Sequence, residues 1–177
     1  MNIQQAVDLI KDAGPLLPRP GQAQHWADLG CGAGLFTEAL VHLLPEASTI
    51  HGIDTNPGFR QQATPNNVTL LPLTADFEKD TLPLSNLDGI LMANSLHYVK
   101  DKPTLLLKLR TYMRAEAPFI IVEYDTDQPV RTWVPYPLSY VSLKKLFTSS
   151  GYPSIQKLGE RPSAYGRANM YAAIAMP

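Results

Sequence analysis

The sequence of 177 residues lacks the features that mark secreted, membrane-bound and nucleic-acid-binding proteins. It has one cysteine, Cys31, which excludes an internal disulfide and indicates a reducing compartment. No apolar run approaches the roughly 18 residues that a membrane-spanning helix needs, and no basic stretch precedes a long apolar one at the N-terminus. The formal net charge is -1, without a block of like charges. We therefore expect a cytoplasmic protein that engages neither nucleic acid nor membrane.

Apolar residues form short runs that alternate with helix-like patterns. Runs typical of strands occupy residues 25–29, 49–54, 68–71, 88–93, 119–124, 155–158 and 170–175. Patterns typical of helices occupy residues 3–13, 34–44, 57–63, 103–114 and 141–150. Because strands and helices alternate through the first five strands, we predict an α/β fold with a doubly wound, mostly parallel, seven-stranded sheet. Only a loop, 161–168, separates the last two strands, which are therefore expected to form an antiparallel edge hairpin.

The chain length suggests one domain, 1–177, with enough mass for a sizeable core. Residues 1–21 are expected to form an N-terminal helix and a proline-containing lead into the first strand. Residues 125–140 interleave aromatic side chains, a cation and prolines after the fifth strand. This connection can be a packed loop or a flap over a substrate, and both interpretations stay open.

Three glycines alternate between the first strand and the first long helix, in the stretch Asp28-Leu29-Gly30-Cys31-Gly32-Ala33-Gly34. Glycines at such a place allow a tight turn and a close approach of the backbone to a ligand. Asp54 stands 20 residues after Gly34, at the end of the second strand, where it can accept from both hydroxyls of a ribose. This layout predicts a site for a nucleoside cofactor.

The spacing of the glycines indicates which cofactor. A dinucleotide fingerprint reads Gly-x-Gly-x-x-Gly, whereas this chain has Gly-x-Gly-x-Gly. Asp28 precedes the first glycine by two residues, and its charge would be unfavourable beside a diphosphate but favourable beside a sulfonium and an ammonium. The cofactor expected is therefore S-adenosylmethionine, and a nicotinamide-dependent oxidoreductase is the disfavoured alternative.

Four motifs resemble those of the class I S-adenosylmethionine-dependent methyltransferases. They lie at residues 28–34, 50–54, 73–77 and 87–101, and the resemblance covers roughly residues 22–177. It implies a Rossmann-like fold, S-adenosylmethionine as methyl donor and S-adenosylhomocysteine as product. It also implies that Asp54 binds the ribose, that Asp76 meets the adenine amino group and that Phe77 packs on the adenine ring. The cofactor-binding residues expected on these grounds are Asp28, Gly30, Cys31, Gly32, Gly34, Asp54, Thr55, Asp76, Phe77 and Asn94.

Each of these residues also has a plainer interpretation. Asp54 could cap a helix that begins near Pro57, and Asp76 could be a turn acid. Cys31 has no evident activating neighbour and is better read as a small packing residue than as a nucleophile.

The sequence identifies the catalytic residues less clearly than the cofactor-binding residues, because methyl transfer needs mainly alignment of the acceptor and exclusion of water. Where the acceptor must lose a proton, a base is also needed. His97 and Tyr124 follow the fourth and end the fifth strand, and ligands in such sheets bind at the carboxyl ends of the strands. They are the candidate catalytic residues, although His97 could simply line the site. The residues expected to line the substrate are His97, Tyr98, Arg131, Trp133 and Tyr136.

Motifs that the sequence lacks narrow the range of possible methyl acceptors. The fourth strand is followed by Asn94-Ser95-Leu96-His97, which matches neither the Asn/Asp-Pro-Pro-Tyr nor the Pro-Cys pattern of DNA-modifying relatives. Asp125 and Asp127 have no matching acid at the end of the fourth strand, so no metal is expected. A small-molecule acceptor is predicted, in a monomer or homodimer. The alternative is a sensor or partner-dependent subunit of the same fold that binds the cofactor without catalysis.

Overall fold

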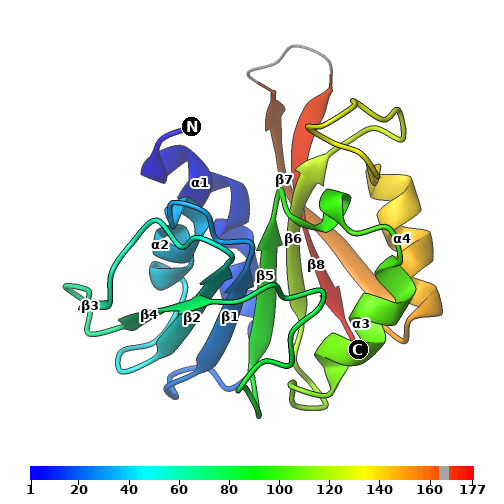
Figure 1. The fold of residues 1–177 in the computed structure, drawn as a ribbon. Helices are drawn as coiled ribbons and strands as arrows, with labels where there is room; N and C mark the ends of the chain where they lie inside the picture. The colour runs from blue at the N-terminus through cyan, green and yellow to red at the C-terminus, as the bar shows by residue number, and fades with distance from the viewer. Residues whose placement is uncertain (164–167) are drawn as a thin grey trace.

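The computed structural model describes residues 1–163 and 168–177 and contains one eight-stranded sheet (Figure 1). Its strands are β1 (His25–Leu29), β2 (Thr49–Asp54), β3 (Gln62–Ala63), β4 (Thr69–Thr74), β5 (Gly89–Ala93), β6 (Phe119–Tyr124), β7 (Ser154–Pro162) and β8 (Asn169–Met176). They lie in the order β3-β4-β2-β1-β5-β6-β8-β7. β4, β2, β1, β5 and β6 are parallel, whereas β3, β7 and β8 pair antiparallel. The predicted α/β class and the antiparallel edge hairpin are confirmed.

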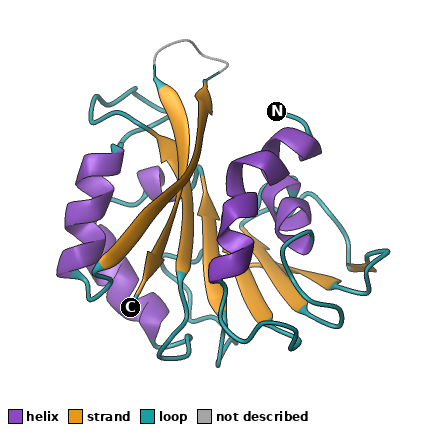
Figure 2. Ribbon diagram, turned by 180° about the vertical axis from the view of Figure 1, so that it is seen from behind, coloured by secondary structure: helices purple, strands orange, loops and turns teal. Residues whose placement is uncertain are grey.

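Helices cover both faces of this sheet, as Figures 1 and 2 show from opposite sides. One face carries α1 (Ile3–Ile10), the 3-10 turn η1 (Lys11–Leu16) and α2 (Leu35–Val41). The other carries the short 3-10 turn η2 (Leu96–Tyr98), α3 (Lys102–Arg110) and α4 (Tyr140–Ser149). The sequence of β6 does not alternate apolar and polar residues because both faces of the strand are buried. Phe119 and Ile121 pack toward α3 and α4, and Ile120 and Val122 pack toward the helices on the opposite face.

Two connections differ from the predicted alternation of strands and helices. Residues 55–68, all described, form no helix, and the helix expected at 57–63 is replaced in part by the two-residue strand β3. The prediction of seven strands was wrong for the same reason. Gly58 donates its N–H to the carbonyl of Gly32 at 2.8 Å, and the ring of Phe59 packs at the position where a Cβ on Gly34 would lie. These contacts with the glycine loop outweigh the weak helical tendency of a short segment that contains Gly58.

The second irregular connection, residues 75–88, also contains no helix in a stretch that is fully described. β4 is longer than predicted, ending at Thr74 rather than Leu71, and it leads directly into this loop. Residues 164–167 of the predicted loop 161–168 lie outside the described residues. β7 and β8 extend to Pro162 and from Asn169, so the hairpin is longer than its apolar pattern indicated.

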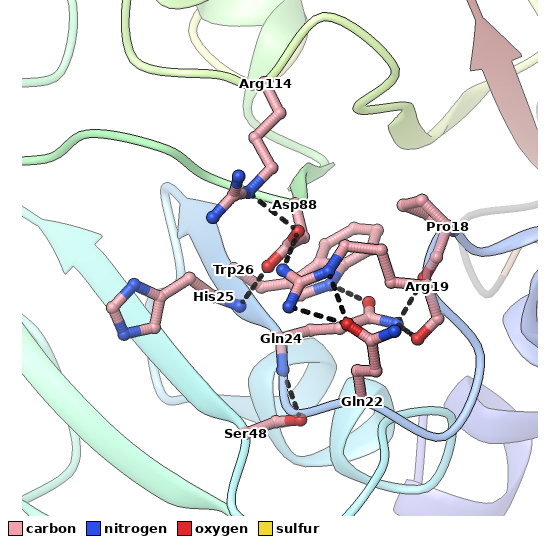
Figure 3. Close-up of polar contacts among 9 residues, drawn as sticks. All are labelled: Pro18, Arg19, Gln22, Gln24, His25, Trp26, Ser48, Asp88 and Arg114. Atoms are coloured by element: carbon pink, nitrogen blue, oxygen red, sulfur yellow. Dashed lines mark hydrogen bonds and ion pairs between the residues drawn. The ribbon is translucent and has the colours of Figure 1, made fainter.

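A buried carboxylate joins the amino ends of β1 and β5 (Figure 3). Asp88 accepts the backbone N–H of His25 at 2.8 Å, and its own N–H donates to the carbonyl of His25 at 2.7 Å. Arg19 and Arg114 lie 2.8 and 3.1 Å from its Oδ1. Asp88 therefore fixes the pairing of β1 with β5 at the edge opposite the glycine loop.

Candidate functional site

The glycine loop lies at the carboxyl end of β1. All three of its glycines have positive φ, at 78° for Gly30, 52° for Gly32 and 88° for Gly34. A Cβ at Gly30 would collide with the side chain of Ser95, whereas a Cβ at Gly32 would meet nothing within 4 Å. The loop is therefore packed tightly at its first glycine and open at its second, where the backbone can approach a ligand.

Asp54 holds this loop against the end of β2. Its Oδ2 accepts the N–H of Gly32 at 3.0 Å, and its Oδ1 accepts the N–H of Asn56 at 3.0 Å. The hydroxyl of Thr55 donates to Oδ1 at 3.4 Å. Because no helix begins after it, Asp54 is not a helix cap. A carboxylate offers about four lone pairs, so these bonds leave acceptor capacity for a ligand.

Asp28 lies beneath the loop and is 1% exposed. Its Oδ2 accepts from the hydroxyl of Thr37 in α2 at 2.6 Å, whereas Oδ1 has no hydrogen-bond partner in the described residues. Burial raises the pKa of Asp28 to about 7, with the hydrogen bond from Thr37 lowering it and the nearby Asp54 raising it. Asp28 is thus a buried acid without a cationic partner in the described part of the chain.

Cys31 is buried, and its Sγ packs against Gly52 of β2. Burial and the carboxylates of Asp28 and Asp54 raise the pKa of its thiol to about 12. The thiol therefore stays protonated near neutral pH, which favours its role as a packing residue.

Asp76 and Phe77 follow β4, and their side chains make different contacts. The carboxylate of Asp76 accepts the backbone N–H groups of Glu78 and Lys79 at 3.1 and 3.2 Å, and the Lys79 ammonium lies 2.6 Å away. Its hydrogen bond with Lys79 holds the pKa of Asp76 below its usual value. This is the arrangement of a turn acid. Phe77 instead reaches the glycine loop, since a Cβ on Gly30 would lie 3.5 Å from its ring.

The end of β5 also faces the loop. Asn94 has a φ of 54° and donates its N–H to the carbonyl of Val122 at 2.8 Å. Its buried Oδ1 has no hydrogen-bond partner in the part of the chain that the structure describes. The hydroxyl of Ser95 donates to the carbonyl of Leu29 at 2.6 Å, which ties this segment to β1. The two unpartnered oxygens, on Asp28 and Asn94, lie in residues at the ends of adjacent strands.

His97 forms a buried pair with a residue that sequence reasoning missed, Glu123 of β6. The Nδ1 atom of His97 lies 2.6 Å from Oε2 of Glu123, and its backbone N–H donates to Oε1 at 3.0 Å. Both side chains are at most 2% exposed. The rings of Tyr98 and Tyr124 lie 4.4 and 6.2 Å from the imidazole, centre to centre. The sequence signal for Glu123 was a single acidic residue after four apolar residues in the strand 119–124.

The segment 125–140 is anchored at several points. Asp125 accepts the N–H of Tyr140 at 2.8 Å, and Asp127 accepts from the N–H and hydroxyl of Ser139. Tyr136 donates its N–H to the carbonyl of His97 at 3.0 Å and accepts from the Lys102 ammonium at 2.8 Å. Burial lowers the pKa of that lysine, and Glu123 partly restores it. Within the described residues, no group of three or more metal-ligating side chains is placed to hold a metal ion.

Aromatic side chains of this segment and of η2 reach the surface, and two of them, Tyr98 and Tyr136, belong to residues in contact with His97. Tyr98 is 52% exposed, Trp133 68% and Tyr136 40%, and Arg131 is also exposed. The structure thus gathers the predicted cofactor residues at the loop and places the predicted substrate-lining residues on the neighbouring segments. Asp76 is the exception, because its side chain is engaged in its own turn.

These features define a methyltransferase of the Rossmann-like class. Residues 27–119 match the methyltransferase-domain family, and the chain belongs to that family. No curated protein matches the chain. None of the helices in the described part of the chain has the length and apolar character that crossing a bilayer requires.

Solved structures of methyltransferases share this fold. One is the Burkholderia thailandensis 1,6-didemethyltoxoflavin-N1-methyltransferase with bound 1,6-didemethyltoxoflavin and S-adenosylhomocysteine, with a TM-score of 0.68 and 15% identity over 98% of this chain and 77% of that chain. Another is a Leishmania major SAM-dependent methyltransferase, with a TM-score of 0.69 and 20% identity over 94% and 71%. A third is the plantazolicin methyltransferase BpumL, with a TM-score of 0.70 and 14% identity over 98% and 83%.

Proposed function

We propose that this chain transfers a methyl group from S-adenosylmethionine to a small-molecule acceptor, with His97 as the base that removes the acceptor proton. The observation that carries this proposal is the buried pair of His97 and Glu123 at the carboxyl end of the sheet. An imidazole oriented by a carboxylate is a common arrangement for proton removal near neutral pH.

The residues at the loop fit the proposed cofactor. The open backbone at Gly32 leaves room for a close approach, and Asp28 and Asn94 each offer an unpartnered oxygen. Asp54 and Thr55 would hold the ribose, and Phe77 would pack against the adenine. When bound, this cofactor supplies an activated methyl group on a positively charged sulfur. Asp76 is the least supported member of the set, since an adenine contact would compete with its turn.

Glu123 determines which nitrogen of His97 is basic. A carboxylate only accepts, so Nδ1 carries the proton that it shares with Glu123 and Nε2 keeps a lone pair. In the proposed reaction, Nε2 would take the proton that the acceptor loses as it gains the methyl group. Tyr124 lies near enough to the imidazole to position the acceptor or the ring.

Exposed aromatic side chains support a small, flat acceptor. Tyr98 and Tyr136 lie next to His97, and the exposed Trp133 and Arg131 belong to the same segment as Tyr136. One solved methyltransferase of this fold holds a heterocyclic substrate, 1,6-didemethyltoxoflavin. We also propose that residues 1–177 form one domain and that segment 125–140 acts as a flap over the acceptor.

The test measures S-adenosylhomocysteine formation with a panel of flat hydroxyl, amine and carbon-acid acceptors. His97→Ala is compared with His42→Ala, an exposed histidine of α2's C-terminal cap. We expect turnover to fall with the first variant only, while calorimetry shows equal affinity for S-adenosylmethionine in both. Cofactor binding without turnover on any acceptor would instead identify a sensor or a partner-dependent subunit, and tight binding of NAD in place of S-adenosylmethionine would overturn the whole assignment.

A further inference from the structure

Asp28 is a buried carboxyl with no positive charge to balance it among the described residues. From α2 it meets the neutral hydroxyl of Thr37, and its partners across the sheet are Gly52 of β2 and Leu91 of β5. The titratable groups that act on it are Asp54, at the end of β2, and the thiol of Cys31 in the loop. Neither supplies a cation, and one of the two Asp28 oxygens has no donor within residues 1–163 and 168–177.

An ionised carboxylate in such a place is unstable, because burial removes its hydration and only the neutral hydroxyl of Thr37 compensates for it. Burial raises the pKa of Asp28 to about 7, into the range where a ligand can change its protonation. A positive charge bound beside the loop would favour the ionised form. The unpartnered Oδ1 would then gain the attraction that it lacks in the chain alone.

We infer that Asp28 exchanges a proton with solvent as the cofactor comes and goes, and that this exchange favours the positively charged methyl donor over its neutral-sulfur product. The inference rests on the proposed function. On donor binding, the Asp28 carboxyl releases its proton to the buffer and becomes a carboxylate. After methyl transfer the sulfur is uncharged, so the carboxylate loses part of its stabilisation and takes up a proton as the product leaves.

The sign of the pH dependence follows from this exchange. Below about pH 7 the free protein holds the Asp28 proton, and the donor must displace it to bind. Affinity for S-adenosylmethionine therefore falls as the pH is lowered, by up to about tenfold per pH unit. Affinity for S-adenosylhomocysteine falls less steeply, so the preference for donor over product grows toward higher pH and levels off above the pKa.

Calorimetry measures this exchange without any turnover. Titration with S-adenosylmethionine at pH 6.5 in phosphate and in imidazole buffers, which differ in ionisation enthalpy, gives the number of protons released. We expect roughly half a proton or more with S-adenosylmethionine, fewer with S-adenosylhomocysteine, and the difference between the two ligands to vanish in Asp28→Asn. Protons released by other groups appear equally in that variant and are subtracted.

Thr37 provides a second test that does not remove the acid. Thr37→Val deletes the hydrogen bond that favours the carboxylate, so the pH midpoint of donor binding should move upward. Thr37→Ser keeps the hydroxyl and should behave as the unaltered protein. If Asp28→Asn fails to fold, as judged by thermal melting, this pair of variants still decides the question.

Two failures are distinguishable. If S-adenosylmethionine and its product both bind, but release equal numbers of protons and keep a constant affinity ratio from pH 6 to 8, the proton exchange is wrong and the proposed function stands. An unmoved midpoint in Thr37→Val would likewise overturn the exchange. If neither ligand binds at any pH, the proposed function itself fails.

Discussion

One carboxylate, that of Glu123, fixes both the ring and the backbone of His97. Its Oε2 lies 2.6 Å from Nδ1 and its Oε1 accepts the backbone N–H at 3.0 Å. Both oxygens are used as acceptors, so the orientation of the imidazole depends on two acceptors at once.

Glu123→Gln removes one of these acceptors while keeping the shape of the side chain. The amide can accept only through its oxygen, so either the backbone N–H or Nδ1 then faces an NH2 group. We expect turnover to fall about 100-fold, because the tautomer with a basic Nε2 is no longer enforced, and affinity for S-adenosylmethionine to stay unchanged. Steady-state rates across pH and calorimetry measure the two effects. Full turnover with an unaltered pH profile would contradict this positioning role.

Asp54→Ala should weaken binding of S-adenosylmethionine by about 1.5–3 kcal/mol, because charge-assisted hydrogen bonds to the ribose are lost. The same change frees the N–H of Gly32, so part of the loss reflects a looser loop. Asp76→Asn is the matched control variant, because the side chain of Asp76 accepts hydrogen bonds from its own turn. It should weaken binding of S-adenosylmethionine by less than about 1 kcal/mol. Calorimetry on both variants gives the ranking, and equal losses would show that Asp76 shares in binding.

Glycines 30 and 32 should differ in the effect of an added methyl group. Gly30→Ala places a Cβ against Ser95 as well as straining a positive φ, and it is expected to lower the free energy of unfolding by more than about 2 kcal/mol. Gly32→Ala meets open space and should cost about 1 kcal/mol from the backbone alone. Urea denaturation measures both. Similar losses would mean that Ser95 moves aside.

The stability of the chain without ligands should depend on pH through Asp28. Burial raises the pKa of Asp28 in the folded protein to about 7, above the ordinary aspartate value of 3.8, so the folded state binds the proton more tightly than the unfolded state between these values. Stability is therefore lost as the pH rises from about 4 to about 7. Asp28→Asn removes this loss and should be more stable than the parent at pH 8, by on the order of 2–4 kcal/mol. Thermal melting from pH 5 to 8 compares the two, and parallel profiles would contradict the expectation.

Asp88→Asn should weaken the fold without altering the reaction. Asn cannot neutralise Arg19 and Arg114, whose side chains are 32% and 40% exposed, so we expect a loss of about 1–2 kcal/mol in the free energy of unfolding. Because Asp88 lies at the amino ends of β1 and β5, whereas the glycine loop follows the carboxyl end of β1, kcat at a temperature well below the melting point should be unchanged. A lower kcat under these conditions would show that the two ends are coupled.

The sequence predicted those parts of the fold that depend on local pattern. The strand, glycine turn and helix around Gly30, Gly32 and Gly34 could be anticipated because positive φ at alternating positions requires those residues. β6 was predictable because burial on both faces demands an unbroken apolar run.

Other parts depended on contacts between distant residues. The segment after Asp54 forms no helix because Gly58 and Phe59 bind the glycine loop, which no local pattern records. Glu123 was overlooked because a single acid at the end of an apolar strand gains meaning only when the turn Leu96–Tyr98 places His97 above it. The unpartnered oxygen of Asp28 likewise follows from packing alone.

The absence of helices in the connections 55–68 and 75–88 leaves the ends of β2 and β4 covered by loops, while β5 and β6 lie under packed helices. Segments with few buried apolar contacts open locally at low free-energy cost, so amide hydrogens around Asp54 and Phe77 should exchange faster than those of β6. A cofactor bound at this edge would slow that exchange by mass action. The concentration of the methyl donor would then determine how often the ends of β2 and β4 open locally.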